Sequence, residues 1–446
     1  MKTALSYQVN DVETYKSKLM FWASKFETCC ILHSNRIGIS GNGIKEPANS
    51  YDLLVATGEN RRFEGGNSDS FEGLKKFCEN KDRWAFGFFT YDLKNELEDL
   101  KSENYDGVGM PDIHFFNPEY LFLVTGNEVT LQIEEGNSQV AKRIKAEIDN
   151  IENTLEEVAT IQSVSRRISE EEYLKCVRNI KDHIRYGNVY ELNFCQEFYA
   201  SKFKLNPFDL FEKLNGISGT PFSSYYRLND KYLICGSPER FMKKTGRRII
   251  SQPIKGTIKR GSTEAEDLTL IKELEQSTKD MNENVMIVDI VRNDLSRTAS
   301  PNSVVVSEMF GIHTFKQVHQ MISTIESELA DDCHFIDAIK EAFPMGSMTG
   351  APKIKAMELI EQFEHTKRGL YSGAVGYIHP SGDFDFNVVI RSILYNSTNE
   401  YLSFIVGGAI TDNSVPEDEY EECLLKAMPM FKALNLNLKD INLVAP

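Results

Sequence analysis

The chain has 446 residues, of which 41% are hydrophobic and 11% aromatic, so it can build a substantial core and is not a disordered protein. Its length predicts two or three domains, or one large two-lobed unit. The formal net charge of −16 disfavours nucleic acid and anionic membrane surfaces as main partners. A small anionic substrate would therefore need a local cationic pocket.

The sequence also indicates a compartment. The polar N-terminal segment lacks the apolar core of a signal peptide, and no apolar run is long enough to span a bilayer. The eight cysteines show neither C-x-x-C pairs nor zinc spacing. We therefore expect a cytoplasmic protein with reduced, mostly buried thiols.

The first third of the chain is typical of mixed α/β structure. CCILHS and SYDLLVAT predict short strands, and YLFLVTGNEVTLQIEEG predicts a hairpin with Gly126-Asn127 at its turn. Residues 138–158 are charged and favour a helix, and ATIQSVSRR is a plausible linker. We place an N-terminal domain at 1–160 and a second, catalytic domain at 168–446, and we expect the two lobes to form one intertwined unit.

A capping box opens the second domain. Ser169 is followed three residues later by Glu172, which predicts a helix beginning there. Beyond this helix, glycine, proline and polar residues interrupt the apolar segments more often. We expect the chemistry in this part of the chain.

Two charged residues in apolar surroundings are candidates for catalysis. Glu239, in CGSPERF, follows the predicted strand KYLIC and is a candidate general acid or base, or a salt-bridge partner of Arg240 or a neighbouring residue. Lys255, in SQPIKGTIKRG, is either a solvated surface charge or a nucleophile. Gly256 and Thr257 form a small, flexible step that would let the backbone come close to a ligand.

Two predicted helices carry carboxylates that could work inside a site. NENVMIVDIVRNDLSR is strongly apolar, so some of its acids, Glu283 among them, must face a pocket or pair inside. PEDEYEECLLKAMPMFKAL places Glu419, Glu422 and Lys426 along one helix face. Such carboxylates can hold magnesium, whereas Glu422 with Lys426 alone would be an ordinary surface ion pair.

Two further stretches indicate anion binding. FNVVIRSI places Arg391 inside an apparent apolar strand, where it needs a planar anion from the protein or from a substrate. In FIVGGAITD, the N–H groups of Gly407 and Gly408 could cradle a carboxylate, and a tight strand bend is equally compatible with the pair.

Taken together and in this order, SPERF, PIKGT, IVDIVRNDLSR, GSMTGAPKIKAM, YSGAVGYI, FNVVIRS and GGAITDNSVPEDEYEECLLKA resemble the chorismate-utilising enzymes over residues 168–446. Within that family they are most similar to the component I enzymes that make aminodeoxychorismate. The resemblance implies a two-lobed α+β fold with four layers, α/β/β/α. Two largely antiparallel sheets pack together in that fold, and the site lies in the cleft between them.

Single positions distinguish the branches of this family. Members that make aminodeoxychorismate carry lysine in PIKGT, as Lys255 here, whereas those that make anthranilate carry alanine. Isochorismate and salicylate synthases place a water-activating lysine where this chain has Glu191. Amine-transferring relatives usually have glutamine there, and many relatives have histidine where this chain has Gln320. ILHS replaces the leucine-glutamate-serine motif of tryptophan-controlled anthranilate synthases, so we expect no such control.

The resemblance implies a covalent mechanism. Lys255 attacks C2 of chorismate while Glu239 protonates the departing C4 hydroxyl, and ammonia then attacks C4 and expels the lysine. The lysine must be neutral to attack, and lowering its pKa from about 10.4 to roughly 7.5 corresponds to about 4 kcal/mol. We expect burial and a nearby magnesium ion to lower it.

The resemblance also implies the remaining ligands. Magnesium binds the ring carboxylate, and its expected ligands are Glu283, Glu422 and Glu419. The expected substrate-binding residues are Thr257, Tyr371, Arg391, Gly407, Gly408, Lys426 and Glu191. Ammonia would come from a separate glutamine amidotransferase subunit, component II, and the product would supply 4-aminobenzoate and folate synthesis. The alternatives are anthranilate synthase component I and a non-catalytic partner built on the same fold.

Overall fold

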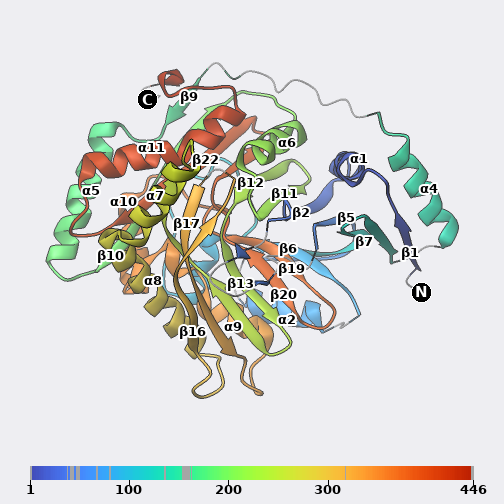
Figure 1. The fold of residues 1–446 in the computed structure, drawn as a ribbon, viewed down its shortest axis with the longest axis horizontal. Coiled ribbons are helices and arrows are strands. Elements are labelled where there is room, and N and C mark those ends of the chain that lie inside the picture. The colour runs from blue at the N-terminus through green and yellow to red at the C-terminus, as the bar shows by residue number, and fades with distance from the viewer. Residues whose placement is uncertain are drawn as a thin grey trace.

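The computed structural model describes residues 3–37, 39–40, 45–46, 51–66, 69–79, 82–134, 137–152, 161, 163–316 and 318–442. Within them, helices cover the outer faces of a large, mainly antiparallel β-structure (Figure 1). Hydrogen bonds join 21 strands into one continuous network, which consists of two sheets connected by a pair of long strands. The predicted α+β class with two largely antiparallel sheets is confirmed.

The first sheet has the hydrogen-bonded order β1-β8-β7-β5-β2-β11-β12-β21-β22-β10, all antiparallel. Its strands are β1 (Thr3–Gln8), β8 (Glu128–Ile133), β7 (Ile113–Thr125), β5 (Leu53–Gly65), β2 (Thr28–His33), β11 (Phe222–Leu228), β12 (Lys231–Ser237), β21 (Ser392–Asn396), β22 (Tyr401–Ile410) and β10 (Glu191–Ser201). β9 (Val164–Arg166) and β18 (Gly350–Ala351) extend it beside β10, and β23 (Ile441–Asn442) pairs in parallel with β9. β3 (Ile39–Ser40) and β4 (Lys45–Glu46) pair separately.

The second sheet continues from β7 through β6, β19, β20, β13, β14 and β17, and β17 also pairs with β15 and β16. Its strands are β6 (Ala85–Phe89), β19 (Ala374–Ile378), β20 (Phe384–Asn387), β13 (Arg240–Thr245), β14 (Arg248–Gln252), β17 (Val318–Glu328), β15 (Ile254–Lys259) and β16 (Val305–Thr314).

The long strands β5 and β7 belong to both sheets. The first half of β5 pairs with β2 in the first sheet. One end of β7 pairs with β8 in the first sheet, and its other end pairs with β6 in the second. Between these halves the register of β5 shifts at Glu59 to Arg61, next to Gly58 with its positive φ of 72°. A bulge of this kind bends a strand, and it allows one pair of strands to pass from the first sheet into the second.

The buried side chains form three main clusters, as a four-layer structure requires. The largest lies between the first sheet and helices that include α1 (Val12–Ser24), α4 (Ser138–Asp149), α5 (Glu170–Arg185), α6 (Pro207–Ser218), α10 (Lys353–Phe363) and α11 (Pro416–Ala433). The second lies between the second sheet and α2 (Ser70–Cys78), α8 (Thr278–Ser296) and α9 (Phe335–Ala342). The third consists mainly of strand residues and fills the space between the sheets.

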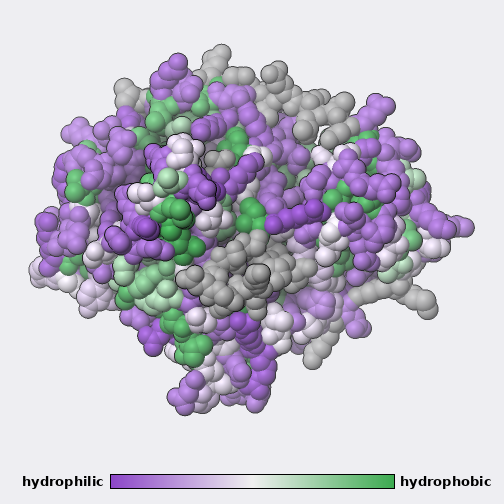
Figure 2. All heavy atoms as spheres, viewed as in Figure 1, coloured by the Kyte–Doolittle hydropathy of each residue, from purple (hydrophilic) through white to green (hydrophobic). Residues whose placement is uncertain are grey.

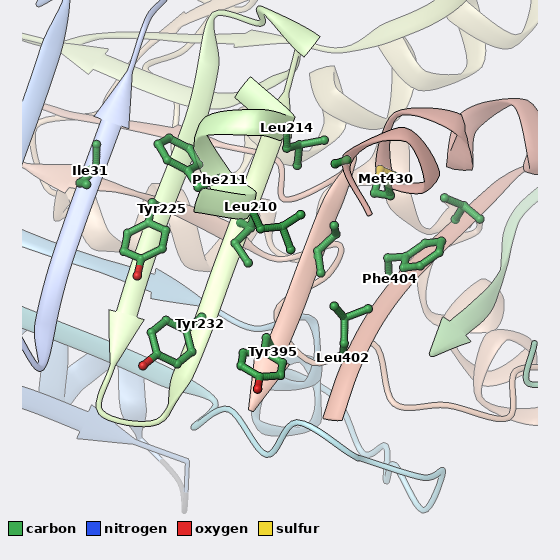
Figure 3. Close-up of a cluster of buried hydrophobic side chains, with 14 of the residues drawn as sticks. Ile31, Leu210, Phe211, Leu214, Tyr225, Tyr232, Tyr395, Leu402, Phe404 and Met430 are labelled. Atoms are coloured by element: carbon green, nitrogen blue, oxygen red, sulfur yellow. The ribbon is translucent and has the colours of Figure 1, made fainter. Parts of the chain in front are cut away.

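The remaining helices are mostly short: η1 (Tyr91–Leu93), α3 (Lys94–Leu97), η2 (Gly346–Met348) and η3 (Leu438–Asp440). The longer α7 (Glu264–Glu275) packs near β15 and β16. In Figure 1, α6 and α11 lie in the upper part of the view and α5 at its left edge, whereas α8, α9 and α2 lie in the lower half beside the second sheet. Figure 3 shows how Leu210, Phe211 and Leu214 of α6 pack onto the strands beside Tyr225 and Tyr232.

Local sequence signals predicted several elements well. The hairpin β7–β8 turns at Gly126-Asn127, and the Ser169–Glu172 capping box opens α5. α4 covers the first part of the predicted helix 138–158, and residues 153–158 lie outside the described residues. The expected linker contains β9, so the boundary between 160 and 168 stays a prediction.

The face of the molecule in Figure 2 is mostly polar: hydrophilic side chains dominate it, and hydrophobic side chains lie in patches between them. None of the helices in the described ranges is both long and apolar enough to cross a bilayer. All eight cysteines are unpaired thiols, and none is fully exposed, as expected.

Candidate active site

The chain passes between the two sheets at two neighbouring points, and each carries a predicted functional residue. Glu239 lies between the end of β12 in the first sheet and the start of β13 in the second. Arg391 lies just before β21, where the chain returns from β20. The N–H of Val388 donates to the carbonyl of Glu239 over 3.0 Å, and the N–H of Gly236 donates to the carbonyl of Arg391 over 3.0 Å. The two crossings therefore lie side by side.

Arg391 does not lie in a strand, contrary to the prediction. Its backbone has a positive φ of 50°, because the chain must turn there to enter the first sheet. Among the described residues, the guanidinium has no hydrogen-bond or ion-pair partner. Burial lowers the pKa of Arg391, and the negative charge of Glu239 opposes that effect. A partly buried, unpaired guanidinium is suited to an anionic ligand.

Glu239 is buried and hydrogen bonded. Ser347 of η2 donates its hydroxyl to Oε1 over 2.7 Å. Burial raises the pKa of Glu239 to about 7, against the opposing effects of Ser347, Lys255 and Arg391. Much of this carboxyl group is thus protonated near neutral pH, as a general acid requires. The alternative salt bridge to Arg240 is wrong, because that guanidinium pairs with Asp385 at 2.9 Å.

Lys255 lies on β15 at the edge of the second sheet, and its Nζ is 3.0 Å from Oε1 of Glu191, the first residue of β10. Both side chains are largely buried, with exposed fractions of 12% and 2%. Burial by itself would lower the pKa of Lys255, but the carboxylates of Glu191, Glu283 and Glu239 outweigh it, and the pKa is raised. The expected lowering is therefore wrong for the ligand-free protein, because the nearest neighbour of this lysine is an anion.

The small residues after Lys255 have a structural role. Gly256 has a positive φ of 91°, and a Cβ there would lie 3.0 Å from the Cβ of Asp280 on α8. Gly256 therefore accommodates helix α8, and the close approach of the backbone to a ligand stays a prediction. Thr257 accepts a 3.4 Å hydrogen bond from the side-chain amide of Gln320 on β17. Gln320 thus lies against a predicted substrate-binding residue.

The three predicted metal ligands come from two helices. Glu283 lies on α8, and Glu419 and Glu422 lie on α11. Burial raises the pKa of Glu283 to about 7, and the charge of Glu422 contributes to this rise. Nζ of Lys279, also on α8, lies 3.6 Å from Glu419 and 3.9 Å from Glu422. The two helices thus bring their carboxylates into one electrostatic cluster.

Lys426 forms the surface ion pair that the helix spacing allowed. Its Nζ lies 2.9 Å from Oε1 of Glu422 and donates to the carbonyl of Gly407 over 2.9 Å. The pair lowers the pKa of Glu422. Gly407 and Gly408 lie within strand β22, opposite Cys195 and Phe194 of β10.

The missing side chains of these glycines make room for neighbours. A Cβ on Gly407 would lie 2.6 Å from Sγ of Cys195, and one on Gly408 would lie 3.3 Å from Oε2 of Glu419. The hydroxyl of Tyr371 lies 3.6 Å from Sγ of Cys195, and burial raises its pKa well above the usual range.

The carboxylates suit a magnesium ion in their chemistry. Glu283 Oε1 and Glu419 Oε1 are buried without a hydrogen-bond partner among the described residues. Magnesium binds through one or two carboxylates and keeps several waters. The described residues hold no ready-made group of three His, Cys, Asp or Glu ligands, and the ammonium of Lys279 lies within ion-pair distance of both Glu419 and Glu422. A divalent cation would replace that ammonium.

Sequence reasoning missed Ser347 and Lys279. Ser347 lies in GSMTGAPKIKAM, 108 residues from the carboxylate to which it donates, so no local pattern links them. Lys279 precedes Glu283 by one helical turn, and that spacing was the signal that could have placed it beside the predicted metal ligands.

Comparisons with known proteins identify the family of this chain. Residues 43–432 match the family described as chorismate binding enzyme. The chain is 32% identical over 370 residues to aminodeoxychorismate synthase component 1 of Bacillus subtilis, covering 80% of this chain and 78% of that protein. It is also 32% identical over 360 residues to anthranilate synthase component 1 of Thermus thermophilus, covering 78% of this chain and 77% of that one.

The fold has solved relatives as well. The crystal structure of anthranilate synthase component I from Streptococcus pneumoniae superposes with a TM-score of 0.75 at 24% identity, covering 90% of this chain and 95% of that one. At that identity the likeness establishes the fold alone. The family match spans most of the chain and includes the predicted site residues, and the chain therefore belongs to the chorismate-binding enzyme family.

Proposed function

We propose that the protein is an aminodeoxychorismate synthase component I, which converts chorismate and ammonia to 4-amino-4-deoxychorismate for 4-aminobenzoate and folate synthesis. The observation that carries the proposal is Lys255, a largely buried lysine on β15 within electrostatic reach of Glu239. In the resemblance, lysine at this position distinguishes aminodeoxychorismate formation from anthranilate formation. Burial at a site with a protonated carboxyl group supports its use as a nucleophile.

Each side chain then has one task. The guanidinium of Arg391, which has no partner among the described residues, binds the pyruvyl carboxylate of chorismate together with Tyr371 and orients the ring. Glu239 holds the proton that the C4 hydroxyl takes as it leaves as water. Lys255 attacks C2 with its electron pair, so the proton that Glu191 now stabilises on Nζ must first pass to solvent, and a solvent proton later restores the acid form of Glu239.

Magnesium is part of the proposal. Glu283 and Glu422 would hold the ion, with Glu419 as a further ligand, and the bound ion would supply positive charge for the ring carboxylate. That charge would also favour the neutral form of Lys255.

Ammonia needs a source. No cysteine of the printed sequence lies in a G-x-C-x-G nucleophile elbow. We therefore expect this chain to use ammonium salts by itself, and to use glutamine only with a separate amidotransferase subunit. Glutamine-dependent turnover by the pure chain would contradict this.

The decisive experiment is product identification. The pure chain is incubated with chorismate, magnesium and ammonium, and the products are separated and identified by mass. 4-Amino-4-deoxychorismate is expected, and anthranilate would instead favour the alternative, to which the 32% identity with an anthranilate synthase component also points.

The covalent role of Lys255 has its own test. Lys255→Arg keeps the charge but not a displaceable amine, so both Lys255→Arg and Lys255→Ala should lose most synthesis. Without ammonia, the parent should carry an adduct on the peptide that contains Lys255. An active arginine variant together with an unmodified peptide would refute covalent catalysis.

A further inference from the structure

The carboxylate of Glu191 offers two oxygens, and only one is used. Oε1 accepts from Nζ of Lys255 over 3.0 Å. Oε2 is buried and has no hydrogen-bond partner among the described residues, and Glu191 as a whole is only 1% exposed. A buried carboxylate oxygen without a donor is costly, so a site of this kind is built for a ligand that donates.

From this geometry we infer that Oε2 of Glu191 binds the incoming nitrogen nucleophile as an ammonium ion. Ammonium carries only N–H donors and one positive charge, and a carboxylate oxygen is an acceptor with negative charge. The inference rests on the proposed function, because it takes ammonia as the second substrate. It assigns to this chain a charged site where the amine-transferring relatives that it resembles usually have a neutral glutamine.

The position of the second oxygen suits the reaction. Both oxygens belong to one carboxylate, so a nitrogen bound to Oε2 lies next to Nζ of Lys255. In the proposed mechanism these two nitrogens bond to C2 and C4, which are separated by one ring carbon. Glu191 directly follows Tyr190, whose exposed fraction is 69%, so strand β10 begins at the protein surface.

Other carboxylates nearby are less suited to the same task. Glu239 is assigned to the leaving hydroxyl and accepts from Ser347. Glu283 lies on α8 among the expected magnesium ligands. Glu191 is the carboxylate that touches the nucleophilic nitrogen itself, at a position that the metal set does not use.

The second displacement balances with Glu191 as proton acceptor. The adduct nitrogen of Lys255 is a secondary ammonium bonded to C2. The bound ammonium gives one proton to Glu191, its freed electron pair forms the bond to C4, and the bond between C2 and Nζ breaks with its pair returning to Nζ. Lys255 then takes the proton from Glu191. This restores the original ion pair and leaves the product nitrogen as –NH₃⁺.

The kinetic test compares the two substrates in the full chain with magnesium, at constant ionic strength kept with sodium chloride. Glu191→Gln removes the charge and keeps the size of the side chain. It should raise the KM for ammonium at least tenfold and leave the KM for chorismate within twofold. The matched control is Glu171→Gln, an exposed carboxylate on α5, which should change neither value. An ammonium KM within twofold of the parent, or a parallel rise of both KM values in Glu191→Gln, would overturn the inference.

A second measurement does not depend on turnover. The parent should melt at a higher temperature in ammonium chloride than in sodium chloride of equal concentration, and Glu191→Gln should lose this difference. An equal difference in both proteins would overturn the site.

The two experiments also separate this inference from the proposed function. If the parent makes anthranilate, the proposed function fails, and the ammonium KM for that product still decides the role of Glu191. If no amine forms, the proposed function fails, and the melting comparison decides the role of Glu191 by itself.

Discussion

Ser347 should set the acid strength of Glu239, and Ser347→Ala tests this. The hydroxyl of Ser347 donates to the carboxylate over 2.7 Å, which stabilises the charged form and holds the pKa of Glu239 down to about 7 against the effect of burial. Alanine removes the donor and leaves the burial unchanged. The pKa should therefore rise further.

The size of the shift follows from the hydrogen bond. A hydrogen bond to a charged group contributes about 1.5–3 kcal/mol, and one pKa unit corresponds to about 1.4 kcal/mol. The pKa of Glu239 should thus move up by roughly one to two units. Since the proposed acid acts in its protonated form, the basic limb of the pH–rate profile should move up by the same amount.

Formation of the Lys255 adduct without ammonia is the suitable assay, because the titration of ammonium does not enter it. The adduct is quantified by mass spectrometry after short incubations between neutral and alkaline pH. Ser347→Thr keeps the hydroxyl and should retain the profile of the parent. A basic limb that stays in place in Ser347→Ala, or moves to lower pH, would refute the assignment of Glu239 as the acid.

Three further outcomes are expected. The folded pKa of Glu239, about 7, exceeds its unfolded value of 4.5, so this group stabilises the metal-free protein below pH 4.5 and that contribution is lost as the pH rises through 7. Relative to the parent, the free energy of unfolding of Glu239→Gln in urea should thus rise by about 3 kcal/mol between pH 4 and pH 8. A difference in unfolding free energy that does not change with pH would contradict the raised pKa of the buried Glu239. Lys279→Met should lower the magnesium Kd about fivefold by calorimetry, because its ammonium competes at Glu419 and Glu422 with a contribution of about 1 kcal/mol; an unchanged Kd would place the metal elsewhere. Arg368→Met leaves the buried carboxylate of Glu364 without the guanidinium that lies 2.6 Å away, and it should lower the free energy of unfolding by about 3–5 kcal/mol. A loss below about 1 kcal/mol would show that the fold does not need the pair of Arg368 and Glu364.

The sequence predicted those features that depend on neighbours along the chain. The capping box at Ser169 opens α5, and Gly126-Asn127 turns the β7–β8 hairpin, since each signal acts within a few residues. The helices that carry Glu283 and Glu422 were also predicted, because an apolar face repeats with the helical period.

Contacts across the chain could not be predicted in the same way. Lys255 and Glu191 are 64 residues apart, and only the relative position of β15 and β10 decides that they touch. We predicted a lowered lysine pKa from burial, and the contact with a carboxylate reverses its sign. The apolar surroundings of Arg391 predicted a strand, but the return of the chain from the second sheet to the first requires a left-handed residue there. Long-range geometry decided each of these points.

The charge balance of the site gives the strongest physical reason to expect a bound cation. The acidic composition led us to expect a local cationic pocket for an anionic substrate. The candidate site instead combines four cationic side chains with five carboxyl groups: Lys255, Lys279, Arg391 and Lys426 with Glu191, Glu239, Glu283, Glu419 and Glu422. The raised pKa values of Glu239 and Glu283, both about 7, remove part of that negative charge near neutral pH.

Neutralising two carboxyl groups in part does not make the site attractive to a substrate with two carboxylates of its own. Three of the four cations are already engaged by protein carboxylates, and Arg391 alone has no partner among the described residues. In the proposed function Arg391 supplies the counter-charge for one carboxylate of chorismate, and the described residues leave the other without one. A divalent ion on Glu283 and Glu422 would supply it, so the proposed magnesium requirement follows from the charges of the side chains as well as from the family resemblance.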